Sequence, residues 1–174
     1  MTHPEDRSQS WLIYGLLLLG LVGRLVPHPW NATPTMAIAL FGGTYLSKRW
    51  SMALTLLIVA ISDLFLGWHT TIPFTWGAFL LTGMLAWWIR PRPSAARILA
   101  GALTGSVLFF VITNFGVWAT QALYPHTAAG LWQCYIAGLP FFRATLLGDV
   151  VFTTVLFGGY ALAAHSPLAR SIAS

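Results

Sequence analysis

The feature that most constrains the fold of this chain is a series of long apolar segments separated by short breaks that contain proline or arginine. A helix needs about 20 apolar residues to cross the hydrocarbon core of a bilayer. Six candidate spans of uneven length cover residues 11–26, 34–46, 50–67, 72–89, 96–122 and 141–164. Charged residues make up only 7% of the sequence, so the chain has too few of them to cover a water-facing surface. The sequence therefore predicts an all-α polytopic membrane protein, a bundle of six transmembrane helices.

The segment at residues 34–46 is the shortest of the six. It can cross a bilayer only if the bilayer is locally thinned, or it is a re-entrant segment that is covered by protein. The charges favour a full span, because Lys48 and Arg49 then lie on the same side of the membrane as most other basic residues.

The distribution of basic residues predicts the orientation of the bundle. Six spans place both termini on one side. That side holds seven of the nine basic residues, namely Arg7, Lys48, Arg49, Arg90, Arg92, Arg97 and Arg170. By the positive-inside rule this side faces the cytoplasm. We therefore expect a cytoplasmic tail at residues 1–10, a transmembrane domain at 11–165 and a second cytoplasmic tail at 166–174.

The same scattering of basic residues excludes a nucleic-acid-binding protein, despite the net charge of +5. No Lys/Arg cluster forms the stripe or arm that phosphate binding requires. Membrane topology accounts for the excess, and the lipid bilayer is the first predicted partner.

Charged side chains inside the apolar segments mark the candidate functional site, because they are costly there. Arg24, Asp63, Arg143 and Asp149 all lie toward the ends of the spans that are predicted to face outward. Asn114 and Trp118 share a helical face in the same layer. Two interpretations stay open: the charges form interhelical salt bridges that fix the bundle, or they line an outward-opening cavity that holds a ligand.

The three predicted outer loops repeat a histidine and a tryptophan. They contain His28 and Trp30, then Trp68 and His69, then His126 and Trp132. Tryptophans commonly anchor a protein at the membrane interface, and loop histidines are commonly solvated. Alternatively the loops converge over the cavity, where His69, His126 and Trp132 contact the ligand. The candidate metal ligands are His28, His69, His126 and Cys134, although a lone cysteine is more typical of a buried inert thiol.

Signatures of an enzyme are lacking. The sequence has no HExxH, GxSxG or P-loop motif. It holds four acidic residues, and two of them, Glu5 and Asp6, precede the first span. We therefore predict neither an enzyme nor a bound cofactor. Small residues at helical spacing, Ala78, Thr82 and Ala86 in one span and Gly101 and Gly105 in the next, predict close helix contacts.

Four stretches carry a family resemblance: NATPTMAIALFGGTYL, ISDLFLGWHTTIPF, TNFGVWATQALYP and CYIAGLPFFRATLLGDVVFTTVLFG. Together they resemble an uncharacterised family of six-span bacterial membrane proteins related to the S-components of energy-coupling-factor (ECF) vitamin transporters. The resemblance covers residues 24–159. It implies a substrate-binding subunit of the bacterial inner membrane, which binds a vitamin or a metal near the external face and docks on an ATP-driven ECF module.

One departure from that family concerns docking. S-components that share a module tend to carry an Ala-xxx-Ala motif in the first span, whereas here that span reads WLIYGLLLLGLVGRLV. A solitary mode is therefore an alternative. In a solitary cobalamin-specific S-component a cysteine ligates cobalt, and this sequence has no cysteine near Trp76, where that residue is expected. Cys134 would have to serve from another loop.

The favoured function is a membrane-embedded substrate-binding protein for uptake of a small molecule. Its predicted binding residues are Arg24, Asp63, His69, Asn114, Trp118, His126, Trp132, Arg143 and Asp149. The alternative is a non-transporting accessory subunit of a larger membrane complex, in which the polar groups brace the bundle. A membrane enzyme that uses a histidine or Asp149 as acid or base is a third hypothesis.

Overall fold

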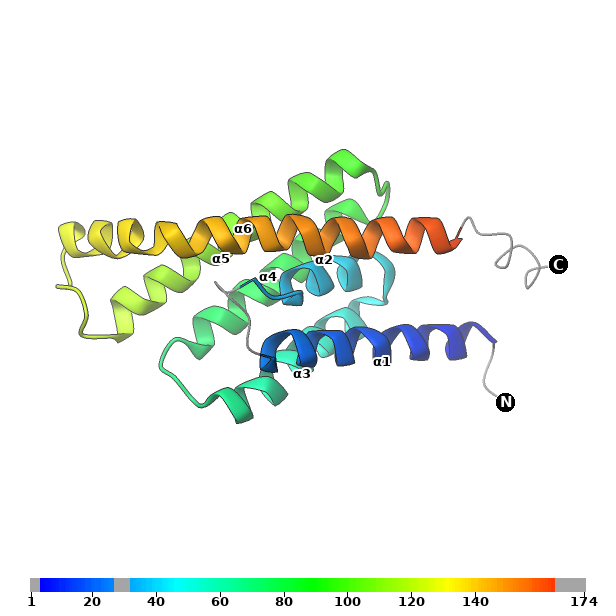
Figure 1. Ribbon diagram of the computed structural model, residues 1–174, viewed down its shortest axis with the longest axis horizontal. Helices are drawn as coiled ribbons and strands as arrows, with labels where there is room; N and C mark the ends of the chain where they lie inside the picture. Colours follow the sequence, from blue (N-terminus) through cyan, green and yellow to red (C-terminus); the bar gives the residue numbers. More distant parts are fainter. Residues whose placement is uncertain (1–3, 27–31, 165–174) are drawn as a thin grey trace.

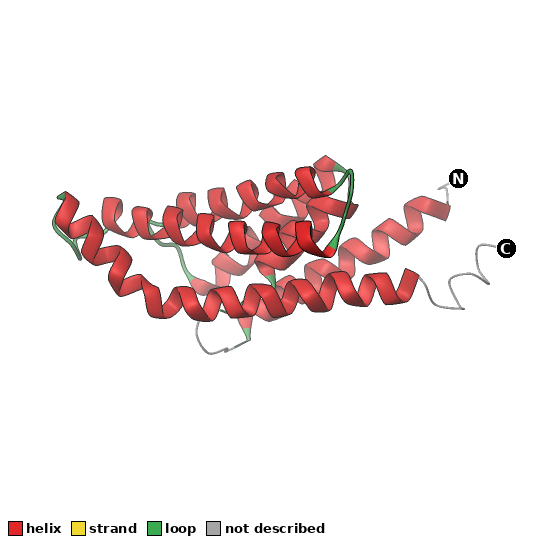
Figure 2. Ribbon diagram, turned by 90° about the horizontal axis from the view of Figure 1, so that it is seen from above, coloured by secondary structure: helices red, strands yellow, loops and turns green. Residues whose placement is uncertain are grey.

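A computed structural model describes residues 4–26 and 32–164, and every regular element in that part of the chain is an α-helix (Figures 1 and 2). The helices are α1 (Pro4–Leu25), α2 (Thr35–Tyr45), α3 (Lys48–Leu66), α4 (Ile72–Ile89), α5 (Ala95–Thr120) and α6 (Ala128–Ala164). They run lengthwise in alternating directions, so the Pro4 end of α1 and the Ala164 end of α6 lie at the same end of the bundle (Figure 1).

The two ends of the bundle differ in charge. Lys48, Arg49, Arg90, Arg92 and Arg97 lie in or beside the α2–α3 and α4–α5 turns, at the end that also holds the start of α1 (Figure 1). We call this the basic end. The α3–α4 and α5–α6 loops lie at the opposite end, where Thr120 Oγ1 of α5 donates to Thr70 Oγ1 at 3.0 Å.

Local sequence signals set several of the helix ends. The side-chain oxygens of Ser47 and Ser94 accept hydrogen bonds from backbone N–H groups in the first turns of α3 and α5. Pro73 lies in the first turn of α4, where no amide donor is needed. Helix α3 ends at Gly67, whose φ of 98° is a conformation that other residues rarely adopt.

Four of the described helices are long and apolar enough to cross a membrane: α3, α4, α5 and α6. The apolar part of α1, Ser10–Leu25, is shorter. Helix α2 has 11 residues, a length of about 16 Å at 1.5 Å per residue. The all-helical membrane-type fold predicted from the sequence is therefore confirmed at the level of these four helices.

Helix α2 is enclosed by the other helices. Every residue from Thr35 to Thr44 is buried, and α2 packs against all five of the other described helices. Phe41 joins Leu54, Ile58 and other apolar side chains in the largest core cluster. Beyond the end of α2, the Arg90 guanidinium donates to the Leu46 carbonyl. The short segment is thus a helix covered by protein on all sides.

Small residues form close helix contacts, as predicted. Ala78, Thr82 and Ala86 of α4 are all buried. A Cβ atom added to Gly105 of α5 would lie 2.9 Å from the Thr82 side chain. One added to Gly43 of α2 would overlap the Gly83 carbonyl and the Ala86 side chain of α4. The absence of a side chain at these glycines therefore lets the helices approach closely.

The predicted start of the last helix was wrong. We expected an outer loop between the spans 96–122 and 141–164, but α6 begins at Ala128 and continues through Pro140. A proline inside a helix costs about 3 kcal/mol. Packing against α5 offsets this cost: Gly130 and Cys134 are buried, and Tyr135 Oη donates to the Val111 carbonyl at 2.9 Å.

Helix α1 also begins earlier than the predicted span. Its first residue is Pro4 rather than Trp11, so residues 4–10 of the expected tail continue the first helix.

Candidate functional site

Three helices meet at a charged cluster near the end opposite the basic end. Arg24 closes α1, and its Nη2 lies 2.5 Å from Asp63 Oδ1 of α3. Its Nε donates to Ser62 Oγ at 2.6 Å. From α4, Trp76 Nε1 donates to the second carboxylate oxygen, Asp63 Oδ2, at 2.7 Å. The cluster therefore links α1, α3 and α4 through charge-assisted hydrogen bonds.

This cluster is nearly closed to solvent. The side chain of Asp63 is 2% exposed and that of Arg24 is 14% exposed. Each oxygen of the carboxylate accepts a hydrogen bond from another helix, and burial shields the remaining lone pairs of Asp63 from a ligand. The sequence-based interpretation of an interhelical salt bridge thus describes what these two residues do in the structure.

An aromatic contact joins the charged cluster to a cavity. The Arg24 guanidinium carbon lies 5.8 Å from the centre of the Phe79 ring. Phe79 in turn contacts Phe109 of α5, with ring centroids 4.9 Å apart. Because Phe109 also lines the cavity, the Arg24 cluster lies behind its aromatic wall.

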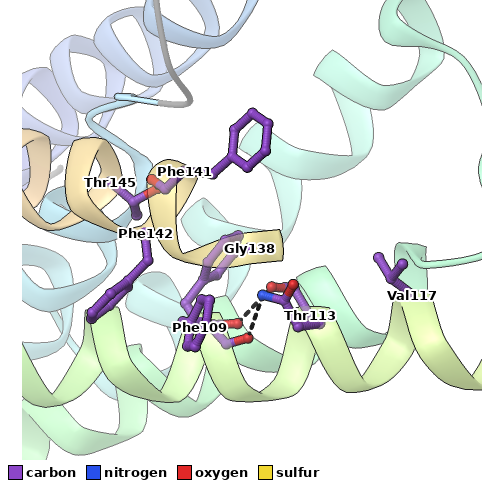
Figure 3. Close-up of a pocket in the computed structure, with 9 residues that line it drawn as sticks. Phe109, Thr113, Val117, Gly138, Phe141, Phe142 and Thr145 are labelled. Carbon is purple, nitrogen blue, oxygen red and sulfur yellow. Dashed lines mark hydrogen bonds between the residues drawn. The ribbon is translucent and has the colours of Figure 1, made fainter. Parts of the chain in front are cut away.

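The cavity lies between α5 and α6 and has a volume of about 180 Å³. Aromatic and small polar side chains line it: Phe109, Phe110, Thr113, Asn114, Val117, Gly138, Phe141, Phe142 and Thr145. In Figure 3, Phe109, Thr113 and Val117 follow one another along α5, opposite Gly138 and Phe142 of α6.

Both threonine hydroxyl donors of this cavity, and one of the two amide N–H donors of Asn114, are used within their own helices. Thr113 Oγ1 donates to the Phe109 carbonyl at 2.7 Å and Thr145 Oγ1 to the Phe141 carbonyl at 3.0 Å. Asn114 Nδ2 donates to the Phe110 carbonyl at 2.8 Å. The two hydroxyl oxygens and the amide oxygen keep lone pairs. The cavity therefore offers hydrogen-bond acceptors on an aromatic surface, and it fits a ligand that donates.

Asp149 lies apart from both features. It is 2% exposed, and Ser106 Oγ of α5 donates to its Oδ2 at 2.7 Å. In the part of the chain that the structure describes, no basic side chain bonds to Asp149. One helical turn further along α6, the buried Thr153 hydroxyl has no hydrogen-bond partner. The Ser106–Asp149 hydrogen bond thus links α5 to α6 at a position closer to the basic end than the cavity is.

The predicted loop histidines His69 and His126 lie in two separate places. His69 Nδ1 lies 2.7 Å from Thr71 Oγ1 in the α3–α4 loop. Trp118 and His126 contact each other edge-on at 5.4 Å between ring centroids, and Trp118 Nε1 donates to the Pro125 carbonyl at 3.0 Å. These contacts hold the α5–α6 loop against the end of α5.

The remaining predicted site residues do not face the cavity. Trp132 is 66% exposed, and Arg143 is exposed on the face of α6 that points away from the cavity-lining Phe142 and Thr145. Cys134 is buried, and its thiol donates to the Asn114 carbonyl at 3.3 Å.

The three candidate metal ligands that the structure describes, His69, His126 and Cys134, do not form a cluster. His28 lies outside the described residues. Among residues 4–26 and 32–164, no three His, Cys, Asp or Glu side chains form a group that could hold a metal ion.

Several residues of the site could not be identified from the sequence. Ser62 was signalled only by its place beside Asp63. Trp76 resembled any interfacial tryptophan, and nothing in the sequence distinguished Phe109 or Gly138 from other apolar residues. A Cβ atom on Gly138 would come close to the Asn114 side chain, and only the packing of α5 on α6 reveals this.

The fold and site together define a class: an all-helical membrane-type protein with a small aromatic cavity toward the end opposite its basic loops. The model of a family of unknown function, DUF6580, matches residues 5–170, so the chain belongs to that family. No curated protein and no solved structure matched the chain.

Proposed function

We propose that this protein is a membrane-embedded substrate-binding protein for uptake of a small molecule, similar to an ECF S-component, in the inner membrane of a bacterium. In this proposal all six helices lie in the membrane, with α2 as a short span enclosed by the others. The basic end faces the cytoplasm, as the positive-inside rule requires, and the cavity between α5 and α6 lies in the outer half.

The observation that carries the proposal is the character of that cavity. An apolar cavity with a few convergent polar groups is the usual form of a small-molecule site. Here Thr113, Asn114 and Thr145 each present a side-chain oxygen that can accept a hydrogen bond. The hydroxyl or amide group of each residue already donates to a backbone carbonyl of its own helix. We therefore propose a ligand that is apolar over most of its surface and carries an O–H or N–H donor.

The size of the cavity narrows the ligand class. A cavity of about 150 Å³ holds one benzene molecule, and sites for drug-sized ligands have about 300–1,000 Å³. The volume here is about 180 Å³. A single-ring molecule fits within this volume, whereas a corrinoid or a haem would extend beyond it. We propose a vitamin-like substrate whose recognised part is one ring.

Phenol and toluene provide a matched pair of probes, because they have nearly the same size and only phenol carries a donor. We expect purified protein in detergent to bind phenol about fivefold more tightly than toluene, since one hydrogen bond contributes about 1 ± 0.5 kcal/mol net. Ligand-detected NMR titrations measure both affinities. Equal affinities for the two probes would contradict a donor-selective cavity.

A glycine pair provides the matched protein variants. Gly138→Ala places a methyl group against Asn114, whereas Gly159→Ala, also in α6, meets nothing within 4 Å. We expect Gly138→Ala to lose phenol binding and Gly159→Ala to keep it. Mass spectrometry of small molecules that co-purify with each variant compares how much natural ligand the two variants hold, and Gly138→Ala should hold less. Unchanged occupancy in Gly138→Ala would exclude this cavity as the site.

A second candidate function, a non-transporting accessory subunit, is favoured by the closure of the Arg24–Asp63 cluster. Its groups satisfy one another and form internal bracing, as that function requires. Empty purified protein that assembles with other membrane subunits, unaffected by Gly138→Ala, would support this function. Stoichiometric assembly with an ATP-driven ECF module would instead support the transport role.

A further inference from the structure

An exposed cation lies on the outer face of α6, surrounded by apolar side chains. Arg143 is exposed, and it makes no hydrogen bond or ion pair in the part of the chain that the structure describes. One turn to either side, Leu139 and Leu147 are 43% and 68% exposed, and Ile136 and Val151 extend the same face. We call these five residues the Arg143 face.

The Arg143 face lies well inside the length of the bundle. Phe142, the preceding residue, packs against Phe110 of α5 with ring centroids 4.7 Å apart. At 1.5 Å per residue, Phe110 lies about 15 Å from the last residue of α5, Thr120, and about 22 Å from its first, Ala95. Both α5 and α6 are long and apolar enough to cross a membrane, and with these helices across a bilayer Arg143 lies near the middle of its hydrocarbon layer.

A guanidinium at this depth requires an anionic partner. Arginine side chains reach the membrane interface by snorkelling when they lie near helix ends, and elsewhere charged groups pair with one another. The position of Arg143 therefore favours a carboxylate within the membrane over the phosphate of a lipid headgroup. The apolar residues on both sides of Arg143 supply the flat surface against which a helix can pack.

A second copy of this chain cannot supply that carboxylate. The sequence has four acidic residues. Two of them, Glu5 and Asp6, lie in the first turn of α1 at the basic end. Asp63 is paired with Arg24, and Asp149 is buried between α5 and α6. The partner is therefore a different polypeptide.

We propose that the Arg143 face docks a transmembrane helix of another protein that places an aspartate or glutamate opposite Arg143. The inference requires only that α6 lies in the membrane. It does not depend on the cavity, because Arg143 points away from the cavity lining. A failed phenol and toluene titration would therefore leave the docking proposal intact, and failure of the docking proposal would leave the proposed cavity ligand intact.

A designed helix tests the proposal directly, because it carries only the chemistry that the Arg143 face is expected to recognise. The probe is a fluorescent single-span polyleucine peptide with one central glutamate, and its control carries glutamine at that position. Full-length protein is reconstituted with each peptide in phosphatidylcholine vesicles, and association is measured by energy transfer. We expect the protein to bind the glutamate peptide at least tenfold more tightly than the glutamine peptide.

Two protein variants assign that preference to one side chain. Arg143→Leu should bind both peptides equally, while Arg92→Leu, at an exposed arginine of the basic end, should keep the preference. Arg143→Leu should also unfold at the temperature of the wild type, because Arg143 bonds to no other described residue. A preference that survives Arg143→Leu, or no preference in the wild type, would overturn the proposal. So would loss of the preference when anionic phosphatidylglycerol replaces zwitterionic phosphatidylcholine, because Arg143 would then pair with the anionic lipid rather than with the peptide carboxylate.

Discussion

Asp63 shows how one side chain can determine the arrangement of three helices. Its two oxygens accept from Arg24 of α1 and Trp76 of α4, while its own backbone belongs to α3. Burial of an ion pair is stabilising only when the pair is well bonded, since both charges lose their hydration. Here the additional bond from Arg24 to Ser62 fixes the guanidinium in its geometry.

The first prediction concerns stability: removing one member of this ion pair leaves a buried charge unpaired, whereas replacing both members with apolar residues leaves none. Arg24→Met leaves a carboxylate that is 2% exposed without its cation, so we expect the free energy of unfolding to fall by about 3–5 kcal/mol. The double variant Arg24→Met/Asp63→Leu removes both charges and should recover most of that loss. Denaturant unfolding in detergent measures both variants. A double variant no more stable than the single one would show that the pair itself is the stabilising element.

The sequence predicted these charged residues but not their relations. Arg24, Asp63 and Asp149 stood out because charges are rare in apolar segments, and all three are bonded to neighbouring helices. Arg143 stood out for the same reason and lies on the opposite face of its helix. Helical spacing alone predicts that Arg143 points in a different direction from Phe142 and Asp149. The depth of Arg143 in the bundle could not be predicted, because the helix was expected to begin after Pro140.

At the scale of the elements, apolar segments bounded by proline, glycine or charged residues predicted most helix positions correctly. The predicted bounds of α3, α4 and α5 agree with the structure within two residues at every end. Helix α6 was predicted 13 residues too short, since a proline was taken as the start of a helix. The packing of Cys134 and Tyr135 on α5 offsets the missing hydrogen bond, and no local signal in the sequence encodes that contact.

The contact between α2 and α4 provides a prediction for the elements. Gly43→Ala inserts a methyl group against the Gly83 carbonyl and Ala86, so α2 must shift or α4 must move away. Overpacking of this kind costs about 1–3 kcal/mol. Gly77→Ala in α4 meets nothing within 4 Å and serves as the control. Thermal unfolding should occur at a lower temperature in Gly43→Ala only, and equal transitions would contradict the close approach.

For the whole molecule, the separation of charge between the two ends predicts the orientation in the membrane. Cys134 is the one cysteine in the sequence, so a Cys134→Ser background leaves no native thiol. Single cysteines then replace Ser94 at the basic end or His126 at the opposite end, and both positions are exposed. A maleimide that cannot cross membranes should label His126→Cys on intact spheroplasts and Ser94→Cys only after permeabilisation. The reverse pattern would invert the proposed topology.

The enclosure of α2 has a consequence for how the protein is made. Its 11 residues are too few to partition into lipid alone as the chain leaves the translocon, where about 20 apolar residues are needed. Arg90, which bonds to the Leu46 carbonyl, is synthesised 44 residues later, and α6, which also covers α2, is synthesised after the other described helices. We therefore expect biogenesis to be ordered, with α2 reaching its final position only after its neighbours are complete. Nascent chains that stop before α6 should expose an unsupported helix and become substrates for membrane proteases.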